Sequence, residues 1–390
     1  MAATAALAAV EPASLSEAFA QGKISLNLRL RYESVQQTGL LDGEALTLRT
    51  RLSFTTAPWQ GWTAMLEAEN IAAADGDSYS QAGINPGGAG HAVIADPVMT
   101  EINQVWLGYK SASDAATLGR QRLVLDNARF VGDVGWRQNM QTFDAFVVQD
   151  KSFDKTTLTY GYLQQINRVF GADHPQGKWA SDSHLFNASY AGLPAGTLTG
   201  YAYLLDFSNS PANSCATYGV SFAGTTRLTA DLSFAYRAEA ATQSDYGAST
   251  LNYSTHYTLL EAGLALKSAS LTLGDELLGS DHNVGFKTPL ATLHAFNGWA
   301  DLFLTTPAAG LRDTYAKATA SLPGACSLLA FYHQFDTDVG GVDLGHELDL
   351  QLSRNFGKAV IALVKFADFR RHSLTLPNVQ KIWAQVEYVY

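Results

Sequence analysis

Apolar and polar residues alternate along most of the chain, in runs of about ten residues. Between Lys23 and Glu33 every odd-numbered position is polar or charged and every even-numbered position is apolar. A period of two predicts a strand with two unlike faces, and about ten residues is the length that a tilted strand needs to cross a bilayer. A soluble β-sandwich allows the same alternation, so one such run does not decide the fold class.

The alternation recurs often enough to predict 18 strands. Repeated runs of this kind between turn residues are typical of a closed, antiparallel transmembrane β-barrel. The predicted strands span residues 23–33, 46–54, 62–69, 100–110, 114–121, 141–150, 155–166, 183–191, 197–207, 215–223, 226–238, 255–267, 269–278, 313–322, 326–335, 344–355, 358–369 and 379–390.

The segments between these strands alternate in length. Residues 110–114 and 355–358 are tight turns, whereas residues 71–99 and 278–312 are long loops. Short periplasmic turns and long extracellular loops, with both chain ends on the turn side, are the pattern of bacterial outer-membrane barrels. The run 293–304 looks strand-like, but a wall strand there would put the later tight turns on the wrong side. We therefore place it in the 278–312 loop as a short helix, and the loop's length suggests a lid or plug.

Composition supports a membrane barrel. Only 16% of the residues are charged, against roughly 25% in an average soluble protein, and there are 17 Tyr, 19 Phe and 7 Trp. A helical membrane protein would need about 18 consecutive apolar residues, and the sequence has no such run. The net charge of −10 argues against a nucleic-acid partner.

The two ends of the chain add separate expectations. Residues 1–21 are small and apolar but lack the basic start of a signal peptide, so we expect a signal remnant or a disordered segment. Residues 22–390 then form a single barrel, and the final run IWAQVEYVY ends in an aromatic residue like the signal read by the outer-membrane assembly machinery. Cys215 and Cys326 are far apart and show no metal-binding spacing; we expect unpaired thiols, although a disulfide stays open.

A charged segment lies between two of the predicted strands. Apolar residues such as Phe130, Val131 and Val134 are interleaved with its arginines and carboxylates. A loop exposed to water would not need such anchors. We therefore interpret residues 122–140 as a loop that folds inward, fixed to the barrel wall while it presents cations to the lumen.

At this point the sequence resembles the alginate-export family of outer-membrane barrels. The resemblance rests on GRQRL at 119–123 and on the segments 129–145, 294–315 and 345–353. It implies a monomeric, 18-stranded barrel whose lumen is narrowed by inward loops and by an arginine-rich constriction that attracts a polyuronate. The family is broad, so its name alone does not fix the solute.

The predicted function is an outer-membrane channel for an anionic or polar solute, either an alginate-like polyuronate or a smaller carboxylate. Arginine binds carboxylates at two points and stays charged, and a cluster within a low-dielectric wall focuses anions. The candidate constriction residues are Arg29, Arg31, Arg49, Arg51, Arg120, Arg122, Arg129, Arg137, Trp106 and Trp136. The candidate acidic lining residues are Glu67, Glu69, Asp126, Asp133 and Asp144.

Several alternatives stay open. The same arginines could pair with these acids and with Glu33 to hold the inward loop, and both roles are compatible. The channel could be nonselective, or the loops could close the barrel into a receptor or adhesin.

Catalysis is not expected, because no Gly-x-Ser-x-Gly elbow occurs and the histidines are scattered. No cofactor is implied, and hydrogen bonding within the loops explains two weak metal patterns better, although a loop-bound calcium stays open. These patterns are His294 with Asp301 and Asp313, and Asp75 with Asp77 and His91.

Overall fold

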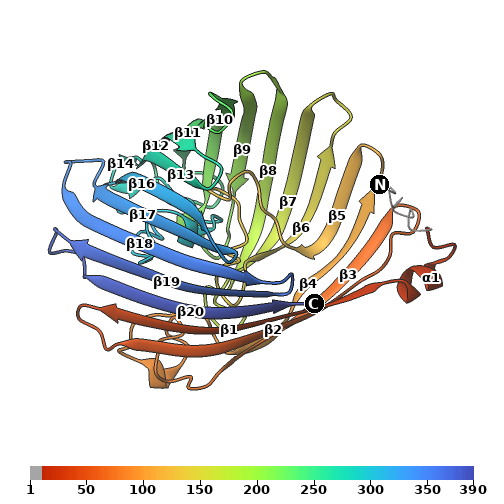
Figure 1. Cartoon of the computed structure of the whole chain (residues 1–390), viewed down its shortest axis with the longest axis horizontal. Coiled ribbons are helices and arrows are strands. Elements are labelled where there is room, and N and C mark those ends of the chain that lie inside the picture. The colour runs from red at the N-terminus through yellow and green to blue at the C-terminus, as the bar shows by residue number, and fades with distance from the viewer. Residues whose placement is uncertain (1–10) are drawn as a thin grey trace.

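Eighteen strands form one closed antiparallel sheet in the computed structural model, which describes residues 11–390 (Figure 1). The barrel closes where β1 pairs with β20. The predicted fold class is therefore confirmed. The wall strands are β1 (Lys23–Gln37), β2 (Gly43–Thr55), β3 (Trp62–Ala73), β4 (Met99–Lys110), β5 (Asp114–Gln121), β6 (Thr142–Asp150), β7 (Thr156–Asn167), β8 (Lys178–Leu193), β9 (Gly196–Leu205), β10 (Cys215–Arg227), β11 (Ser233–Ser244), β12 (Ser254–Ala265), β13 (Ala269–Leu278), β16 (Leu311–Leu322), β17 (Cys326–Asp336), β18 (Asp343–Phe356), β19 (Val360–Arg371) and β20 (Val379–Val389).

The remaining elements are short. They are the helix α1 (Leu15–Ala20), the 3-10 turns η1 (Pro86–Gly88), η2 (Pro211–Asn213) and η3 (Leu293–Ala295), and the hairpin of β14 (Ser280–Asp281) and β15 (Val284–Gly285). Within residues 11–390, no helix has the length and apolar content needed to cross a membrane.

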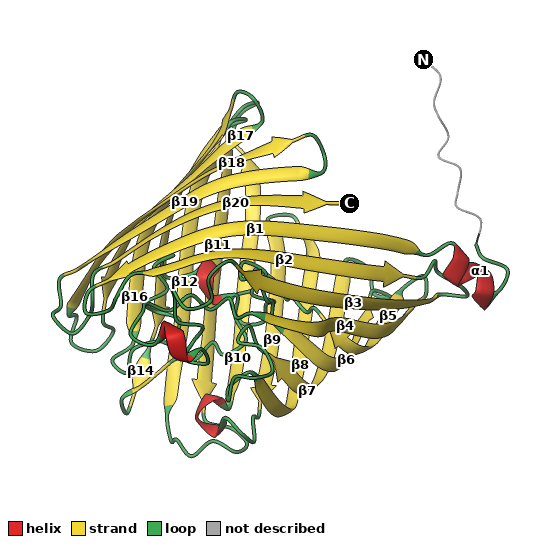
Figure 2. Cartoon of the chain, turned by 90° about the horizontal axis from the view of Figure 1, so that it is seen from below, coloured by secondary structure: helices red, strands yellow, loops and turns green. Residues whose placement is uncertain are grey.

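The described part of the segment before the barrel contains a helix. Helix α1 lies beyond the ends of β2 and β3, outside the barrel as expected (Figure 2). Its first turn is capped by the Ser14 side chain, which accepts from the Glu17 amide, so residues 11–21 are not disordered. The rest of the expected signal remnant, residues 1–10, lies outside the described residues.

One predicted strand is misplaced. The run 226–238 was expected to be a single strand, but β10 continues to Arg227 and β11 begins only at Ser233. A tight turn between them is closed by the Leu228 amide, which donates to the Leu232 carbonyl. Because apolar and polar residues alternate without interruption through this turn, the pattern carries no sign of it.

The two faces of the wall differ sharply in polarity. In β1, Ile24 is 64% exposed on the outer face, whereas Arg31 and Glu33 point inward and are buried. The other strands repeat this arrangement, with exposed residues such as Leu118 and Leu260 outside. An apolar exterior around a polar interior is the arrangement of a barrel that spans a lipid bilayer.

Two long loops fill the lumen. Residues 122–141, the arginine loop, and residues 279–310, the long loop, both lie within the barrel (Figure 1). The arginine loop is anchored by Phe130, whose ring lies 5.2 Å from that of Tyr201 and 5.3 Å from that of Tyr257. The arginine loop thus packs against the inner wall, and the run 293–304 stays out of the wall, with a single 3-10 turn at its start.

Candidate functional site

Four arginines form a ladder on the inner wall. Arg29 in β1 stands directly opposite Arg49 in β2, with Arg31 and Arg51 at neighbouring inward positions. All four side chains are nearly inaccessible, and those of Arg31 and Arg49 are at most 1% exposed. The predicted ladder therefore exists, but the arginine loop covers it.

The ladder holds the backbone of the arginine loop. The Arg31 guanidinium donates to the Trp136 carbonyl (2.6 Å), and Arg29 donates to the same oxygen (3.2 Å). Arg51 donates to the Gln138 carbonyl (3.1 Å). Charged donors form the stronger hydrogen bonds in proteins, so these contacts fix how far the loop reaches into the lumen.

Each ladder arginine also has a carboxylate partner. Such pairing supports the alternative interpretation, in which the arginines form a salt-bridged lining that positions the loop. The partners come largely from elements that the sequence did not associate with the ladder. The pairs are Arg29–Glu387 (3.1 Å), Arg49–Glu387 (3.1 Å), Arg31–Asp96 (3.5 Å) and Arg51–Glu69.

The arginines of the loop itself are paired as well. Arg137 bridges Glu33 (3.0 Å) and Asp301 (2.9 Å), and Arg129 binds Glu276 (2.7 Å). Burial alone would lower the pKa of Arg137, but the surrounding carboxylates outweigh it and raise this pKa. Arg137 is therefore a permanent cation at the meeting point of the two loops and β1.

Two predicted pore residues face the wrong way. Arg120 stands opposite Asp144, in register with Leu118 opposite Phe146. Leu118 and Phe146 are 60% and 40% exposed on the outer face, and strand residues two apart share a face. Arg120 and Asp144 therefore form a salt bridge (2.7 Å) on the outer wall, and their predicted place in the lumen is corrected.

The other predicted residues lie inside but apart from the ladder. Trp106 faces inward from β4, opposite Met65. The remaining contacts are Arg122 with Asp133 (2.8 Å), Glu67 with Asn103 (3.1 Å) and Gln104 (3.0 Å), and Asp126 with Asn187 (2.8 Å).

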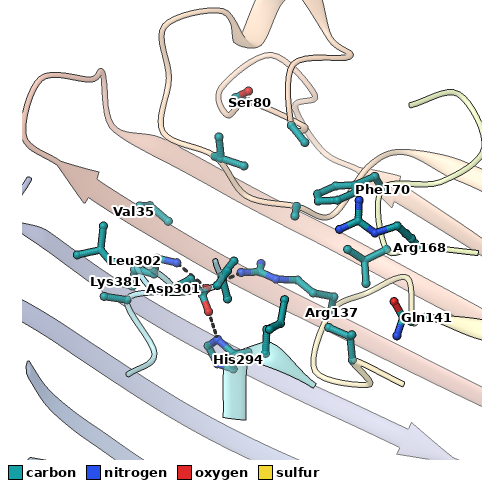
Figure 3. Close-up of a pocket in the computed structure, with 18 of the residues that line it drawn as sticks. Val35, Ser80, Arg137, Gln141, Arg168, Phe170, His294, Asp301, Leu302 and Lys381 are labelled. Carbon is teal, nitrogen blue, oxygen red and sulfur yellow. Dashed lines mark hydrogen bonds and ion pairs between the residues drawn. The ribbon is translucent and has the colours of Figure 1, made fainter. Parts of the chain in front are cut away.

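A buried charged cluster joins both loops to the wall (Figure 3). Asp301 in the long loop accepts from Lys381 of β20 (2.7 Å) and from Arg137 (2.9 Å), and its other oxygen lies 2.7 Å from Nδ1 of His294. The Lys365 ammonium of β19 lies 2.6 Å from Nε2 of the same imidazole. We call these five residues, together with Trp136, the latch.

The contacts of His294 define its protonation state. While Lys365 is protonated its ammonium group only donates, so Nε2 accepts from Lys365 and Nδ1–H donates to Asp301. The imidazole is then neutral, and burial, reinforced by Lys365 and Arg137, holds the pKa of His294 well below its usual range. Burial alone would raise the pKa of Asp301, but His294, Lys381 and Arg137 hold it well below its usual range.

Aromatic rings surround the latch lysine. The Lys365 ammonium lies 3.5 Å from the ring centroid of Trp299 and 4.1 Å from that of Trp136. Trp136 also stacks on His294, with centroids 4.8 Å apart, and lies 4.1 Å from the Arg31 guanidinium and edge-on to Trp383, with centroids 5.8 Å apart. Trp136, expected to contact solute, therefore packs the two loops together. Sequence reasoning missed Lys365 and Lys381, although Lys365 stands in the apolar run 360–367 and Lys381 is the single basic residue of β20.

A cavity of about 620 Å³, which we call the vestibule, lies beside the latch and is lined by residues of both loops. Apolar side chains line most of it, and its charged lining residues are Arg137, Arg168, Asp301 and Lys381. Arg168 lies beside Phe170 (Figure 3), at 3.9 Å from the Trp179 ring centroid, and donates to the Gln176 carbonyl (3.1 Å). It forms no salt bridge within the described part of the chain. Burial lowers the pKa of Arg168 to about 10, so it is charged at neutral pH.

A second cavity of about 310 Å³, the inner chamber, lies deeper in the barrel. Leu293 and His294 line the vestibule, whereas the next residues, Ala295 to Asn297, line the inner chamber. The segment 293–297 therefore separates the two spaces. The inner chamber is bounded by polar wall residues such as Lys317 and Tyr315.

The proposed metal patterns and the disulfide are not assembled. Within residues 11–390, no group of three or more His, Cys, Asp or Glu side chains is placed to hold a metal ion. Asp313 pairs with His333 (2.9 Å) instead of joining the other two members of its pattern, and His91 contacts the Asp42 carbonyl. Cys215 and Cys326 are both free thiols, as expected.

Comparison with solved structures identifies the architecture. Pseudomonas aeruginosa OpdL superposes with a TM-score of 0.72 at 16% identity, over 95% of this chain and 99% of that one. Acinetobacter baumannii OccAB3 gives 0.75 at 12% identity, over 95% and 99%. P. aeruginosa OccK1 (OpdK) gives 0.73 at 14% identity, again over 95% and 99%.

The fold is that of the Occ/Opd outer-membrane porins. No family model and no curated protein matches the sequence, so the resemblance to the alginate-export family stays a prediction. At these identities the likeness concerns the fold, and the solute must be argued from the lumen of this chain.

Proposed function

We propose that the protein is a channel of the bacterial outer membrane through which a small anionic solute, with carboxylates as the favoured class, diffuses. The observation that carries the proposal is the lining of the vestibule. Three cations, Arg137, Arg168 and Lys381, face this cavity together with one carboxylate, Asp301. A cluster of cations within low-dielectric walls raises the local concentration of anions.

The arginine ladder has an indirect part in this proposal. Its side chains are bound to carbonyls and carboxylates, so they set the position of the arginine loop and contribute to the field of the lumen. Direct contact with solute falls to the vestibule cations. Arg168 is the best placed of these, because it is not neutralised by a salt bridge within residues 11–390.

The size of the vestibule favours a small solute over a polyuronate. A cavity of about 620 Å³ suits one small molecule, since ligand sites span roughly 300–1,000 Å³. A polymer would have to pass the segment 293–297 as a continuous thread. The expected lipid and assembly-machinery partners and the monomeric state stay predictions.

Reversal potentials in planar bilayers under a KCl gradient test the proposal. We expect anion preference in the wild type, and Arg168→Gln should lower the anion-to-cation permeability ratio by about fivefold, because one charge at 4 Å is worth about 1 kcal/mol in water. Lys267→Gln is the matched control, because Lys267 is an 85%-exposed cation outside both cavities.

Two results would contradict this proposal. Cation preference in the wild type would rule out an anionic solute. Wild-type reversal potentials in the Arg168→Gln variant would show that Arg168 does not contribute to the selectivity. A barrel that inserts but shows no single-channel steps would favour the receptor or adhesin alternative.

A further inference from the structure

An apolar furrow of about 560 Å³ crosses the outer wall from β17 to β2. Two small residues form its floor. In the strand register Ala384 lies between Tyr32 and Val364. Ala362 lies between Arg354 and Val386. Larger outward side chains lie on both sides of Ala362 and Ala384. A groove therefore runs over these two alanines on the lipid-facing surface.

A single cation stands at the end of the furrow. Arg354 is exposed two residues before the end of β18, next to a tight turn, and its guanidinium lies 4.7 Å from the centroid of Phe356. Within the described residues it forms no salt bridge. A charged side chain on the lipid face of a barrel costs up to roughly 2–4 kcal/mol at the bilayer centre and much less at the interface. Arg354 therefore belongs at the level of the periplasmic headgroups, where an anion would be its natural partner.

Two other furrows on the outer wall lack this feature. One, lined by Phe222 and Leu260, has Asp275 as its outward charged residue, because Arg237 turns inward to Glu239 (2.6 Å). Another, lined by Leu158 and Phe186, includes only Asp150 as a charged residue. Of these three furrows, only the one at Arg354 combines a groove for an apolar chain with a cation that forms no salt bridge among the described residues.

We propose that this furrow binds one phospholipid of the periplasmic leaflet. One acyl chain lies over Ala362 and Ala384, and the phosphodiester receives hydrogen bonds from the Arg354 guanidinium. Arginine suits this role because its planar fork donates two parallel hydrogen bonds to phosphate oxygens. The stacking of Arg354 on Phe356 restrains the guanidinium beside the furrow.

Native mass spectrometry of the detergent-purified full chain, with phosphatidylglycerol added at limiting concentration, tests the proposal. The wild type should retain one lipid, and Arg354→Gln should weaken retention by roughly tenfold, the loss expected for a charge-assisted hydrogen bond. Ala384→Trp fills the floor and should have the same effect. Diacylglycerol, which lacks the phosphate, should bind the wild type as weakly as phosphatidylglycerol binds Arg354→Gln.

Matched controls separate this site from the general lipid-facing surface. Lys267→Gln removes a cation from another tight turn, and Ala318→Trp enlarges an outward alanine of β16, so both should retain lipid like the wild type. Equal retention by Arg354→Gln and the wild type would overturn the proposal. So would a wild-type dimer that Ala384→Trp dissociates, because the furrow would then be covered by a second copy of the chain.

The protein's own thiols provide a second measurement. Cys326 lines the furrow and stands directly opposite Arg354, whereas Cys215 is fully buried. A bulky maleimide on Cys326 should therefore displace the lipid without altering the barrel. Full retention of lipid by the labelled protein would contradict the proposed site.

Discussion

Replacing Asp301 by alanine is expected to release both inward loops while the barrel stays closed. Asp301 is the common partner of Lys381, Arg137 and His294, all nearly inaccessible. Removing one member of a buried ion pair costs about 3–5 kcal/mol, because the remaining charges are left without a partner. The wall does not depend on this residue, since neighbouring strands are held by their own backbone ladders. Single-channel conductance should rise, and proteases should cleave within residues 279–310.

A matched variant distinguishes the latch from a general loss of charge. Asp275→Ala removes a carboxylate from the outer face, where its partner Arg312 is 57% exposed. Exposed pairs contribute at most about 1 kcal/mol, so conductance and protection from proteolysis should match the wild type. If Asp301→Ala also behaved like the wild type in both measurements, the latch would not hold the loops.

Acid is expected to open the channel through His294. Both ring nitrogens are engaged, with Nε2 accepting from Lys365, so an added proton would place two cationic donors face to face. The pKa of His294 is depressed in the closed state, and released loops would restore it towards its ordinary value of about 6.5. The open state therefore binds a proton at His294 more readily than the closed state does. His294 favours closure fully above about pH 6.5, and this contribution is lost as pH falls towards the depressed pKa. Conductance measured downwards from about pH 6.5 should therefore rise.

The environment of the imidazole supports this direction. Lys365, Arg137 and Lys381 all gather around the His294–Asp301 pair, and Asp301 stays ionised because its own pKa is depressed. His294→Gln removes the titrating group and should abolish the response to acid, whereas His256→Gln, on the exposed outer face of β12, should keep it. An acid response that persists in His294→Gln would assign it to another group.

The alternation of apolar and polar residues predicts the wall strands, because it shows which residues of each strand face outward and which face the lumen. The exposed Ile24 and the buried Arg31 occupy the positions that alternation assigns to them. The β10–β11 turn was missed because the pattern runs through it without a break. Arg120 was misplaced for another reason: β5 has the predicted bounds 114–121, and Arg120, two residues from Leu118, shares its outward face, but the prediction did not apply the alternation to this residue.

The candidate site needed information that alternation does not contain. A period of two says that Arg29 and Arg49 point inward, but it cannot say that Glu387 of the last strand pairs with both. Likewise, the meeting of His294 with Lys365 depends on how a long loop crosses the lumen. Such contacts depend on how the first and last strands pair to close the barrel and on how the loops pack in the lumen. The alternation of residues along the sequence does not show either.

In the proposed channel, the two spaces on either side of residues 293–297 would act as filters in series. The outer one, at about 620 Å³, admits bulkier molecules than the inner one, at about 310 Å³. A compound that fits only the first would enter, stall and obstruct the passage of smaller ones. Capture and permeation would then obey different size limits, so the tightest-binding molecules need not be those that cross.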